Sequence, residues 1–433
     1  MQIMNPSKNQ SLSWDALLFA ALAFLYIALY QDAKGAFIVL AVTIYFLLDT
    51  LFPLSALDPS TRTWRWVVMA KMTMILFVVA LVAILTTVLS IGERRMTTPE
   101  KFSNESTSQI EAALDFLARG ISPYGQDYSD TQMGAHSFLL HGVSVSPGLK
   151  HFVYMPLILE MSFPFYWLSL QTLGWWDQRI LYIALLLITL GILTMLTEDP
   201  SRKMSLMLFL GLNPLLMLGF LDGHNDIIAI FWVALAVLVL QRNHRSFSTV
   251  FFAMACISKQ LVWFVAPFFV LYLLGPLPWS HRKLFQMTRE LAPGILISLT
   301  TLLPFLLWTP QAFIYDTLIY MMGASGTETF LANGYGLGEL LVDAGVLSNP
   351  FADFPFVWIE LAVAIPLLVW LGRRLIQARQ QHLIWLFGGV LSLAVVFFHR
   401  FYHGNYIGFF VFLIALGMFS DEPRNANDDL AIE

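Results

Sequence analysis

The sequence predicts an all-α fold: a bundle of transmembrane helices that crosses the membrane many times. Two observations support this prediction. Of the 433 residues, 58% are hydrophobic and only 12% are charged, whereas soluble domains carry about 25% charged residues. Residues 72–92 and 291–315 contain no charged residue, and each stretch is longer than the roughly 20 apolar residues that a helix needs to cross a bilayer.

Apolar segments of helical length follow one another along the chain, and we expect about 12 crossings from them. The segments lie near 13–31, 35–54, 66–91, 154–173, 179–197, 204–221, 226–240, 246–257, 261–275, 290–309, 356–372, 382–398 and 405–420. Segment 246–257 would be only about 18 Å long at 1.5 Å per residue. Such short helices often frame a site, because irregular backbone inside a membrane survives only where it lines protein or water.

Two polar stretches, at about 93–153 and 310–355, interrupt the apolar series. We therefore divide the chain into an N-terminal pair of helices (1–60), a central module (61–280) that includes the first polar stretch, and a C-terminal group of helices (281–433) that includes the second. The N-terminus enters its first apolar segment without a small-residue cleavage site, so we expect no removable signal peptide.

Composition argues against a nucleic-acid-binding protein and against a fold stabilised by disulfides. The net charge is −5 and no basic stripe is present, which argues against a nucleic-acid partner. The single cysteine, Cys256, lies in an apolar run, so an internal disulfide is impossible and a small buried hydrophobic role is expected.

The distribution of Lys and Arg predicts which connections lie outside the membrane. Residues 290–372 contain no Lys or Arg, so the polar stretch 310–355 is predicted to be external. Counting from there places three short, chemically rich connections on the same external face: 221–226, 258–260 and 399–403. If 93–153 is also external, one segment among 154–173, 179–197 and 204–221 does not cross. We expect it to be 154–173, because Pro156 and Pro164 favour a bend or a re-entrant path.

Lys259 is the only charged residue among the 35 positions from Ser246 to Ser280. An unpaired ammonium at bilayer depth costs several kcal/mol, so such a lysine is a candidate functional residue. Two other interpretations stay open: a side chain that extends to the interface, and an ion pair inside the bundle.

Asp222, His224, Asn225 and Asp226 place two carboxylates, an imidazole and an amide within five positions. They either form a hydrophilic turn, with Asp226 favoured in the first turn of the next helix, or line a polar cavity that holds sugar hydroxyls, a proton or a metal. We predict no metal site, because no third carboxylate follows at a fixed spacing; a divalent cation at the two aspartates stays an alternative.

Arg400, with His399 and His403 on either side, lies between two apolar segments. An arginine with two histidines can bind a phosphate, although basic and aromatic residues also anchor helices at interfaces. Lys259 and Arg400 on one face together favour an anionic ligand.

The first polar stretch contains a predicted helix that lies along the membrane surface. Ser108 and Glu111 have capping-box spacing and Gly120 is a natural end, which gives Glu111 a structural role. Glu105 has no such role. It lies in the polar run 103–106, where a solvated surface position is the simplest alternative to a catalytic one.

The order of motifs resembles that of the GT-C superfamily of integral membrane glycosyltransferases, in particular the bacterial branch that uses polyprenyl-phosphate sugars. The likeness covers roughly residues 95–275 and is weaker beyond. The motifs that carry it are Gln109 with Glu111-Ala112-Ala113, the run Gly120 to Tyr128 with Pro123-Tyr124 and Asp127-Tyr128, Val153-Tyr154-Met155-Pro156, Asp177 with Arg179, Asn213-Pro214 with Gly223-His224-Asn225-Asp226, and Lys259 with Pro267.

The resemblance implies an inverting transferase that moves a monosaccharide, a mannose-like hexose or a pentose, from a polyprenyl-phosphate donor to a hydroxyl of a glycan, lipid or protein acceptor. It implies a multi-pass protein of a bacterial or archaeal plasma membrane, surrounded by membrane lipids, with its site on the extracytoplasmic side. No cofactor is expected. The first two helices are an addition to the usual pattern of the family.

A carboxylate in the first external loop is the base of that family, commonly an aspartate four residues before the glutamine. Here that position holds Glu105, with Asp127 and Glu111 as alternatives. Lys259, Arg400, His399 and His403 are the expected phosphate ligands. The sugar and acceptor are expected to contact Asp222, His224, Asn225, Asp226, Tyr124 and Tyr335, and the glycine-rich stretch 323–338 to cover the acceptor groove. A lipid or sugar transporter that uses the same intramembrane charges is the alternative function.

Overall fold

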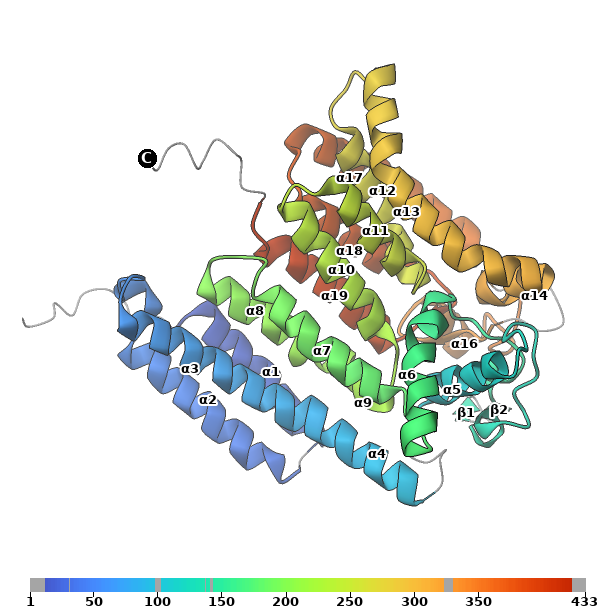
Figure 1. The fold of residues 1–433 in the computed structure, drawn as a ribbon, viewed down its shortest axis with the longest axis horizontal. Helices are drawn as coiled ribbons and strands as arrows, with labels where there is room; N and C mark the ends of the chain where they lie inside the picture. Colours follow the sequence, from blue (N-terminus) through green and yellow to red (C-terminus); the bar gives the residue numbers. More distant parts are fainter. Residues whose placement is uncertain are drawn as a thin grey trace, which may run out of the picture.

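The computed structural model describes residues 12–30, 32–97, 103–136, 138–140, 143–322 and 330–422. The chain begins with helices that pack side by side along one edge of the molecule (Figure 1). They are α1 (Trp14–Tyr30), α2 (Lys34–Leu51), η1 (Leu54–Ala56), α3 (Arg62–Val79), the π-helical η2 (Ala80–Leu85) and α4 (Thr86–Met96). Helix α1 packs against α2 and also against α8 (Pro200–Gly211), so the N-terminal pair is joined directly to the centre of the bundle.

The first polar stretch folds beside one end of the bundle (Figure 1). It contains α5 (Glu105–Ala118), η3 (Gln132–Ala135), the antiparallel pair β1 (Phe138–Leu140) and β2 (Val143–Val145), and η4 (Pro147–Leu149).

The remaining helices form the bundle and the second polar stretch. They are α6 (Leu157–Leu173), α7 (Arg179–Leu193), α8, α9 (Pro214–Asp222), α10 (Asp226–Gln241), α11 (Arg245–Cys256), η5 (Gln260–Phe264), α12 (Ala266–Leu274), α13 (His281–Trp308), α14 (Pro310–Ile314), η6 (Tyr315–Ile319), α15 (Tyr320–Met322), α16 (Leu337–Asp343), α17 (Phe356–Ala378), α18 (His382–Val396) and α19 (Gly404–Phe419). The short strands β3 (Asn333–Gly334) and β4 (Phe401–Tyr402) pair in parallel.

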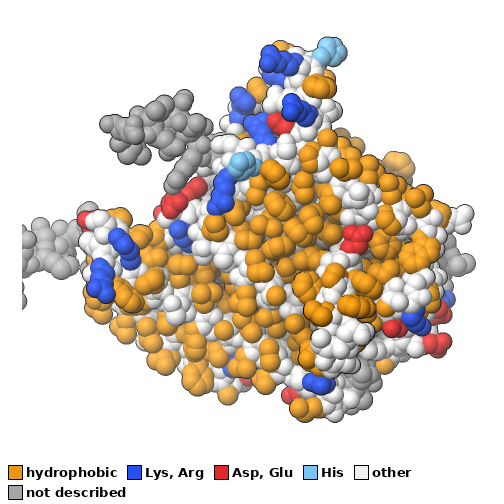
Figure 2. Space-filling view, in the orientation of Figure 1, with side chains coloured by type: hydrophobic (Ala, Val, Ile, Leu, Met, Phe, Trp, Pro, Cys, Tyr) orange, Lys and Arg blue, Asp and Glu red, His pale blue; other side chains and the backbone are white. Residues whose placement is uncertain are grey.

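A helical fold with few strands is therefore confirmed, and each of the thirteen apolar segments contains helix. By length and composition, four of the described helices can cross a membrane, or five if α8 and α9 count as one bent span. Hydrophobic side chains cover most of the face in Figure 2, and Lys and Arg gather at its upper and left edges. This surface is compatible with a membrane protein; the expected 12 crossings stay a prediction.

The break in the helices lies in segment 204–221, two segments after the one expected to bend. Helices α8 and α9 meet at an angle of 45°, because Pro214 starts α9 and the Asn213 side chain caps it by accepting a hydrogen bond from the Leu215 amide. Helix α6 is continuous through Pro164 and follows directly after Pro156. Helix α6 therefore contains no break, and whether 154–173 is the segment that does not cross stays a prediction.

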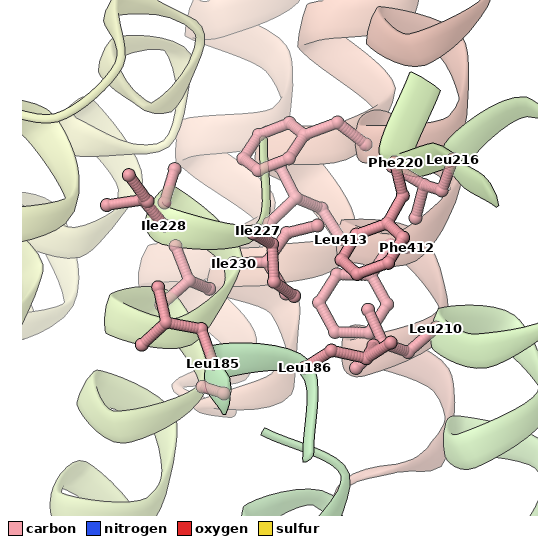
Figure 3. Close-up of a cluster of buried hydrophobic side chains, with 14 of the residues drawn as sticks. Leu185, Leu186, Leu210, Leu216, Phe220, Ile227, Ile228, Ile230, Phe412 and Leu413 are labelled. Carbon is pink, nitrogen blue, oxygen red and sulfur yellow. The ribbon is translucent and has the colours of Figure 1, made fainter. Parts of the chain in front are cut away.

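The hydrophobic core extends through the bundle, and one part of it lies where α7, α8, α9, α10 and α19 meet (Figure 3). Leu186, Ile230 and Leu413 are among its fully buried side chains, each below 2% exposed. This packing holds α9 and α10 in place. The turn between these two helices carries the polar residues from Asp222 to Asp226.

A second buried group of charges lies among the N-terminal helices. The Lys71 ammonium in α3 pairs with Asp15 of α1 and Asp49 of α2, each at 2.7 Å, and Tyr45 and Ser201 donate hydrogen bonds to Asp15. Asp15 and Lys71 have no exposed surface. One lysine thus joins three helices to the start of α8.

Replacing Lys71 with methionine is expected to destabilise the protein by about 3–5 kcal/mol, because it leaves two buried carboxylates without their cation. The measurement is the thermal unfolding midpoint in detergent. Lys34→Met is the matched control: Lys34 pairs with Asp32 at a partly exposed position, so its loss should cost at most about 1 kcal/mol. Equal shifts for both variants would contradict the assigned role of the cluster.

Candidate functional site

A cavity of about 460 Å³ opens where the two polar stretches meet the turns of the bundle. Each of the three chemically rich connections contributes to its wall: His224 and Asn225 from the first, Lys259 from the second, and His403 from the third. Glu105 from the first polar stretch and Asn333 from the second are among the other polar residues of the wall. Residues far apart in the sequence therefore meet at one place.

The start of α5 positions Glu105 in this wall. Asn104 caps the helix by accepting a hydrogen bond from the Ser106 amide at 2.8 Å, so α5 begins three residues before the predicted capping box at Ser108. The Asn104 amide donates to the Asp222 carbonyl at 2.8 Å, and the Thr107 hydroxyl donates to the Gly223 carbonyl at 2.8 Å. Helix α5 therefore docks directly on the turn between α9 and α10.

Gly223 permits this docking. Its φ of +96° is accessible mainly to glycine, and a Cβ there would lie 2.0 Å from the Thr107 hydroxyl oxygen. From Ser106 to Leu114 every residue of α5 is buried. This part of α5 therefore packs against protein rather than directly against lipid, and its orientation along a membrane surface stays a prediction.

The Glu105 carboxylate is held by the backbone of the first polar stretch. Its Oε1 accepts a hydrogen bond from the Gly148 amide at 2.8 Å, and the Gln109 side chain donates to the Gly148 carbonyl at 2.6 Å and to the His151 carbonyl at 2.8 Å. Burial raises the pKa of Glu105 above its ordinary value, although the Gly148 hydrogen bond opposes this shift. A partly buried carboxylate with a raised pKa is suited to accept a proton.

Gly148→Ala is expected to destabilise the protein by about 1–3 kcal/mol and to lower activity, because its Cβ would lie 2.8 Å from Glu105 Oε1 and 2.8 Å from the Met133 methyl carbon. The unfolding midpoint checks the first effect. The control is Gly191→Ala in α7, where a Cβ meets nothing within 4 Å, so it should be neutral or slightly stabilising. A wild-type midpoint and activity for Gly148→Ala would show that the contact with Glu105 is dispensable.

Lys259 forms an ion pair inside the bundle. Its ammonium lies 2.6 Å from Asp226 Oδ1 and donates to Asn225 Oδ1 at 3.0 Å. Asn405 in turn donates to Asp226 Oδ2 at 2.9 Å. Of the interpretations left open for Lys259, the structure thus shows pairing. An ammonium has three N–H donors, and among the described residues two side chains, Asn225 and Asp226, accept from this one, so the cavity-facing lysine has a third N–H for a ligand.

The turn that carries Lys259 is tied to both polar stretches. The neighbouring Gln260 donates to the Val153 and Thr317 carbonyls, each at 3.1 Å. Asp316, which is buried, accepts from the Gly125 amide at 2.8 Å and lies 2.8 Å from His151 Nδ1. The two polar stretches are thereby fastened to each other and to Lys259.

Asn225 Nδ2 and His403 Nε2 are among the buried polar atoms of the cavity residues that have no hydrogen-bond partner within the described ranges. Buried polar atoms are nearly always hydrogen-bonded, so these two mark where a polar ligand would be held. The His403 ring is stacked on Phe401, with 4.1 Å between ring centroids, which fixes its orientation.

Arg400 and His399 do not line the cavity. Arg400 is 1% exposed, and its Nη2 lies 3.4 Å from the Pro350 and Ala352 carbonyls. Nδ1 of His399 accepts a hydrogen bond from the Phe401 amide at 3.1 Å. The prediction that Arg400 and His399 line the ligand site beside Lys259 is therefore not met by the structure. Residues 350–356 enclose Arg400 instead.

Glu111 lies in a buried ion network outside this cavity. Arg94 pairs with Glu111 at 2.7 Å and with Asp177 at 2.8 Å, and Arg179 pairs with Asp177 at 2.8 Å. The Gln178 amide also donates to Glu111 at 2.9 Å. This network joins α4, α5 and the start of α7, which is a structural role.

The other expected site residues lie apart from the cavity wall. Asp127 is fully exposed and accepts from the Ser129 amide at 2.8 Å, which lowers its pKa. The Asp222 side chain and Tyr335 are exposed, Tyr335 to 68%. Tyr124 is 1% exposed and donates to the Tyr154 carbonyl at 2.9 Å. The expected cover includes 323–329, which lies outside the described residues.

Several cavity residues were not singled out from the sequence, among them His136, Asn333, Asn405 and Tyr406. Asn405 lies in the first turn of the apolar helix that follows the connection 399–403, and Asn333 lies in the glycine-rich stretch 323–338 that was expected to cover the groove, so both positions carried a usable signal. Within the part of the chain that the structure describes, no three His, Cys, Asp or Glu side chains are grouped to hold a metal ion.

Comparisons with known proteins add nothing to this geometry: neither the protein-family models nor the curated proteins contain a match to the chain.

Proposed function

We propose that the chain is an inverting glycosyltransferase that moves a monosaccharide from a polyprenyl-phosphate donor to an acceptor hydroxyl on the extracytoplasmic side of a membrane. The observation that carries the proposal is a partly buried carboxylate, Glu105, and a lysine, Lys259, in the wall of one cavity. The motif order from residue 95 to 275, which resembles the GT-C superfamily, supports it, as does a fold rich in apolar helices.

The proposed reaction needs one base and one stabiliser of phosphate. The Glu105 carboxylate takes the proton of the acceptor hydroxyl, whose oxygen forms a bond to the anomeric carbon. The bond from that carbon to the phosphate oxygen breaks on the opposite face, and the electron pair leaves with the lipid phosphate. The departing phosphate gains negative charge, which the free N–H of Lys259 and the unpartnered nitrogen of His403 can stabilise.

The proposed topology follows the sequence argument: about 12 crossings, with both polar stretches outside. The sugar would be bound by Asn225, His224 and Asn333, which are polar residues of the same wall. Asp226 acts in this proposal as the ion-pair partner that positions the Lys259 ammonium.

The experiment is reconstitution in liposomes with a panel of polyprenyl-phosphate sugars, scored for free polyprenyl phosphate and for glycosylated acceptor. Release of both from at least one donor is the expected result. The Lys259–Asp226 pair also suits a transporter of lipid or sugar. Transbilayer movement of a labelled donor, with no bond cleavage for any member of the panel, would establish that second function instead.

Transfer activity is expected to rise with pH as Glu105 loses its proton. Since burial raises the pKa of Glu105, the midpoint of this rise should lie above the value of an ordinary glutamate, about 4.3. The measurement is kcat/KM against pH for a soluble acceptor analogue. The conservative Glu105→Asp variant should move the midpoint; an acidic limb that does not move would assign it to another group.

A further inference from the structure

A second cavity, of about 260 Å³, lies at the opposite end of the hairpin that carries Lys259. Helix α11 begins at Arg245, in the wall of this cavity, and ends at Cys256, three residues before Lys259. The return path through η5 and α12 ends at Leu274, beside Gly275 in the same wall. The hairpin thus connects the two cavities, with Lys259 at its tip and the second cavity at its base.

Two arginines from different helices face this second cavity. Arg379, at the end of α17, forms no ion pair and no side-chain hydrogen bond within the described residues, and its φ of +56° is unusual for a residue with a side chain. Arg245 lies 3.8 Å from the nearest oxygen of Glu290, a long contact, and Glu290 also accepts a hydrogen bond from Gln286 at 3.0 Å. The cavity therefore holds more positive charge than its neighbours neutralise.

Another carboxylate nearby is already engaged. Glu422 is close enough to affect Tyr272 electrostatically, but its two oxygens accept hydrogen bonds from the Gln381 amide at 2.9 Å and the His382 amide at 3.1 Å, and it pairs with the His382 ring. It does not form an ion pair with Arg379.

The rest of the wall is mostly apolar and comes from α12 and α17. Leu271, Leu375 and Ile376 line it together with the Tyr272 ring. The same end of the bundle carries every Lys and Arg between residues 242 and 379 except Lys259: Arg242, Arg245, Arg282, Lys283, Arg289, Arg373, Arg374 and Arg379. Figure 2 shows Lys and Arg side chains gathered at the upper edge, where α13 begins in Figure 1.

We propose that this cavity binds the phosphate of an anionic phospholipid headgroup. Guanidinium groups bind phosphate oxygens in pairs, and basic pockets between transmembrane helices on the Lys- and Arg-rich side are suited to such headgroups. The leucine and isoleucine side chains give the lipid its apolar surface, which a free phosphate ion would not use. The site is independent of the proposed transferase activity and needs neither Glu105 nor Lys259.

The test uses the full chain, purified in mild detergent and examined by native mass spectrometry after exchange into vesicles of phosphatidylglycerol and phosphatidylcholine. The wild-type protein is expected to retain phosphatidylglycerol in preference to phosphatidylcholine. Arg245→Gln with Arg379→Gln should reduce that preference by about tenfold or more, since each charge-assisted contact is strong. Arg373→Gln is the matched control, because it removes the same charge from the same helix at an exposed position outside the cavity.

Three results would overturn the proposal. The first is an unchanged preference in the double variant, with its unfolding midpoint in lipid-free detergent close to wild type. The second is an equal loss in Arg373→Gln, which would show a general effect of surface charge. The third comes from a separate arm with inorganic phosphate alone: saturable binding that depends on both arginines, without any lipid preference, would assign the arginines to a free phosphate ion and remove the headgroup.

Discussion

Glu105→Gln is expected to lower the rate of sugar transfer by about 10²- to 10⁴-fold, the usual contribution of a positioned base. The amide keeps the shape of the side chain and can still accept the hydrogen bond from the Gly148 amide, but it cannot take a proton. Donor affinity should stay within about twofold of wild type, because no part of the proposed phosphate contact depends on Glu105. Single-turnover transfer and donor binding, measured on the same liposomes, separate the two quantities.

The controls come from the other two candidate acids. Asp127→Asn should leave transfer unchanged, because Asp127 is exposed and lies away from the cavity. Glu111→Gln should instead lower the unfolding midpoint, because it weakens the buried network with Arg94 and Asp177. Wild-type turnover in Glu105→Gln, together with a large loss in Asp127→Asn, would transfer the role of base to Asp127.

Much of the candidate site was accessible from sequence because membrane topology restricts where a connection can lie. The counting of Lys and Arg placed the connections 221–226, 258–260 and 399–403 on one face, and residues of all three line one cavity. Glu105 stood out because no helix pattern explained it. Its helix nevertheless begins earlier than the capping-box spacing indicated, since Asn104 supplies the cap.

Side-chain direction was beyond sequence reasoning. Arg400 and His403 are three residues apart, yet His403 lines the cavity, whereas Arg400 contacts the Pro350 and Ala352 carbonyls. That difference depends on where residues 350–356 fold, which no local pattern encodes. The Asp15–Asp49–Lys71 cluster was missed for the same reason, because its members are single charges in three separate helices.

Lys259→Met is expected to have two effects of different origin. It leaves Asp226 buried without its cation, which should cost about 3–5 kcal/mol of stability. It also removes the charged donor proposed for the lipid phosphate, which is worth about 1.5–3 kcal/mol, or roughly 10- to 100-fold in donor affinity. A change in activity alone would not distinguish a misfolded site from a lost ligand contact, so the unfolding midpoint and donor affinity are both measured.

The double variant Lys259→Met with Asp226→Asn separates the two effects. It removes both charges together, and asparagine can still form a hydrogen bond with Asn405, the present partner of Asp226. Stability should return most of the way to wild type, since neutral replacement of a buried pair is often tolerated. Donor affinity should stay as low as in the single variant, because the N–H that meets the phosphate is still absent. If affinity recovers together with stability, Lys259 serves only to neutralise Asp226, and the phosphate must be bound by other groups of the cavity, His403 first among them.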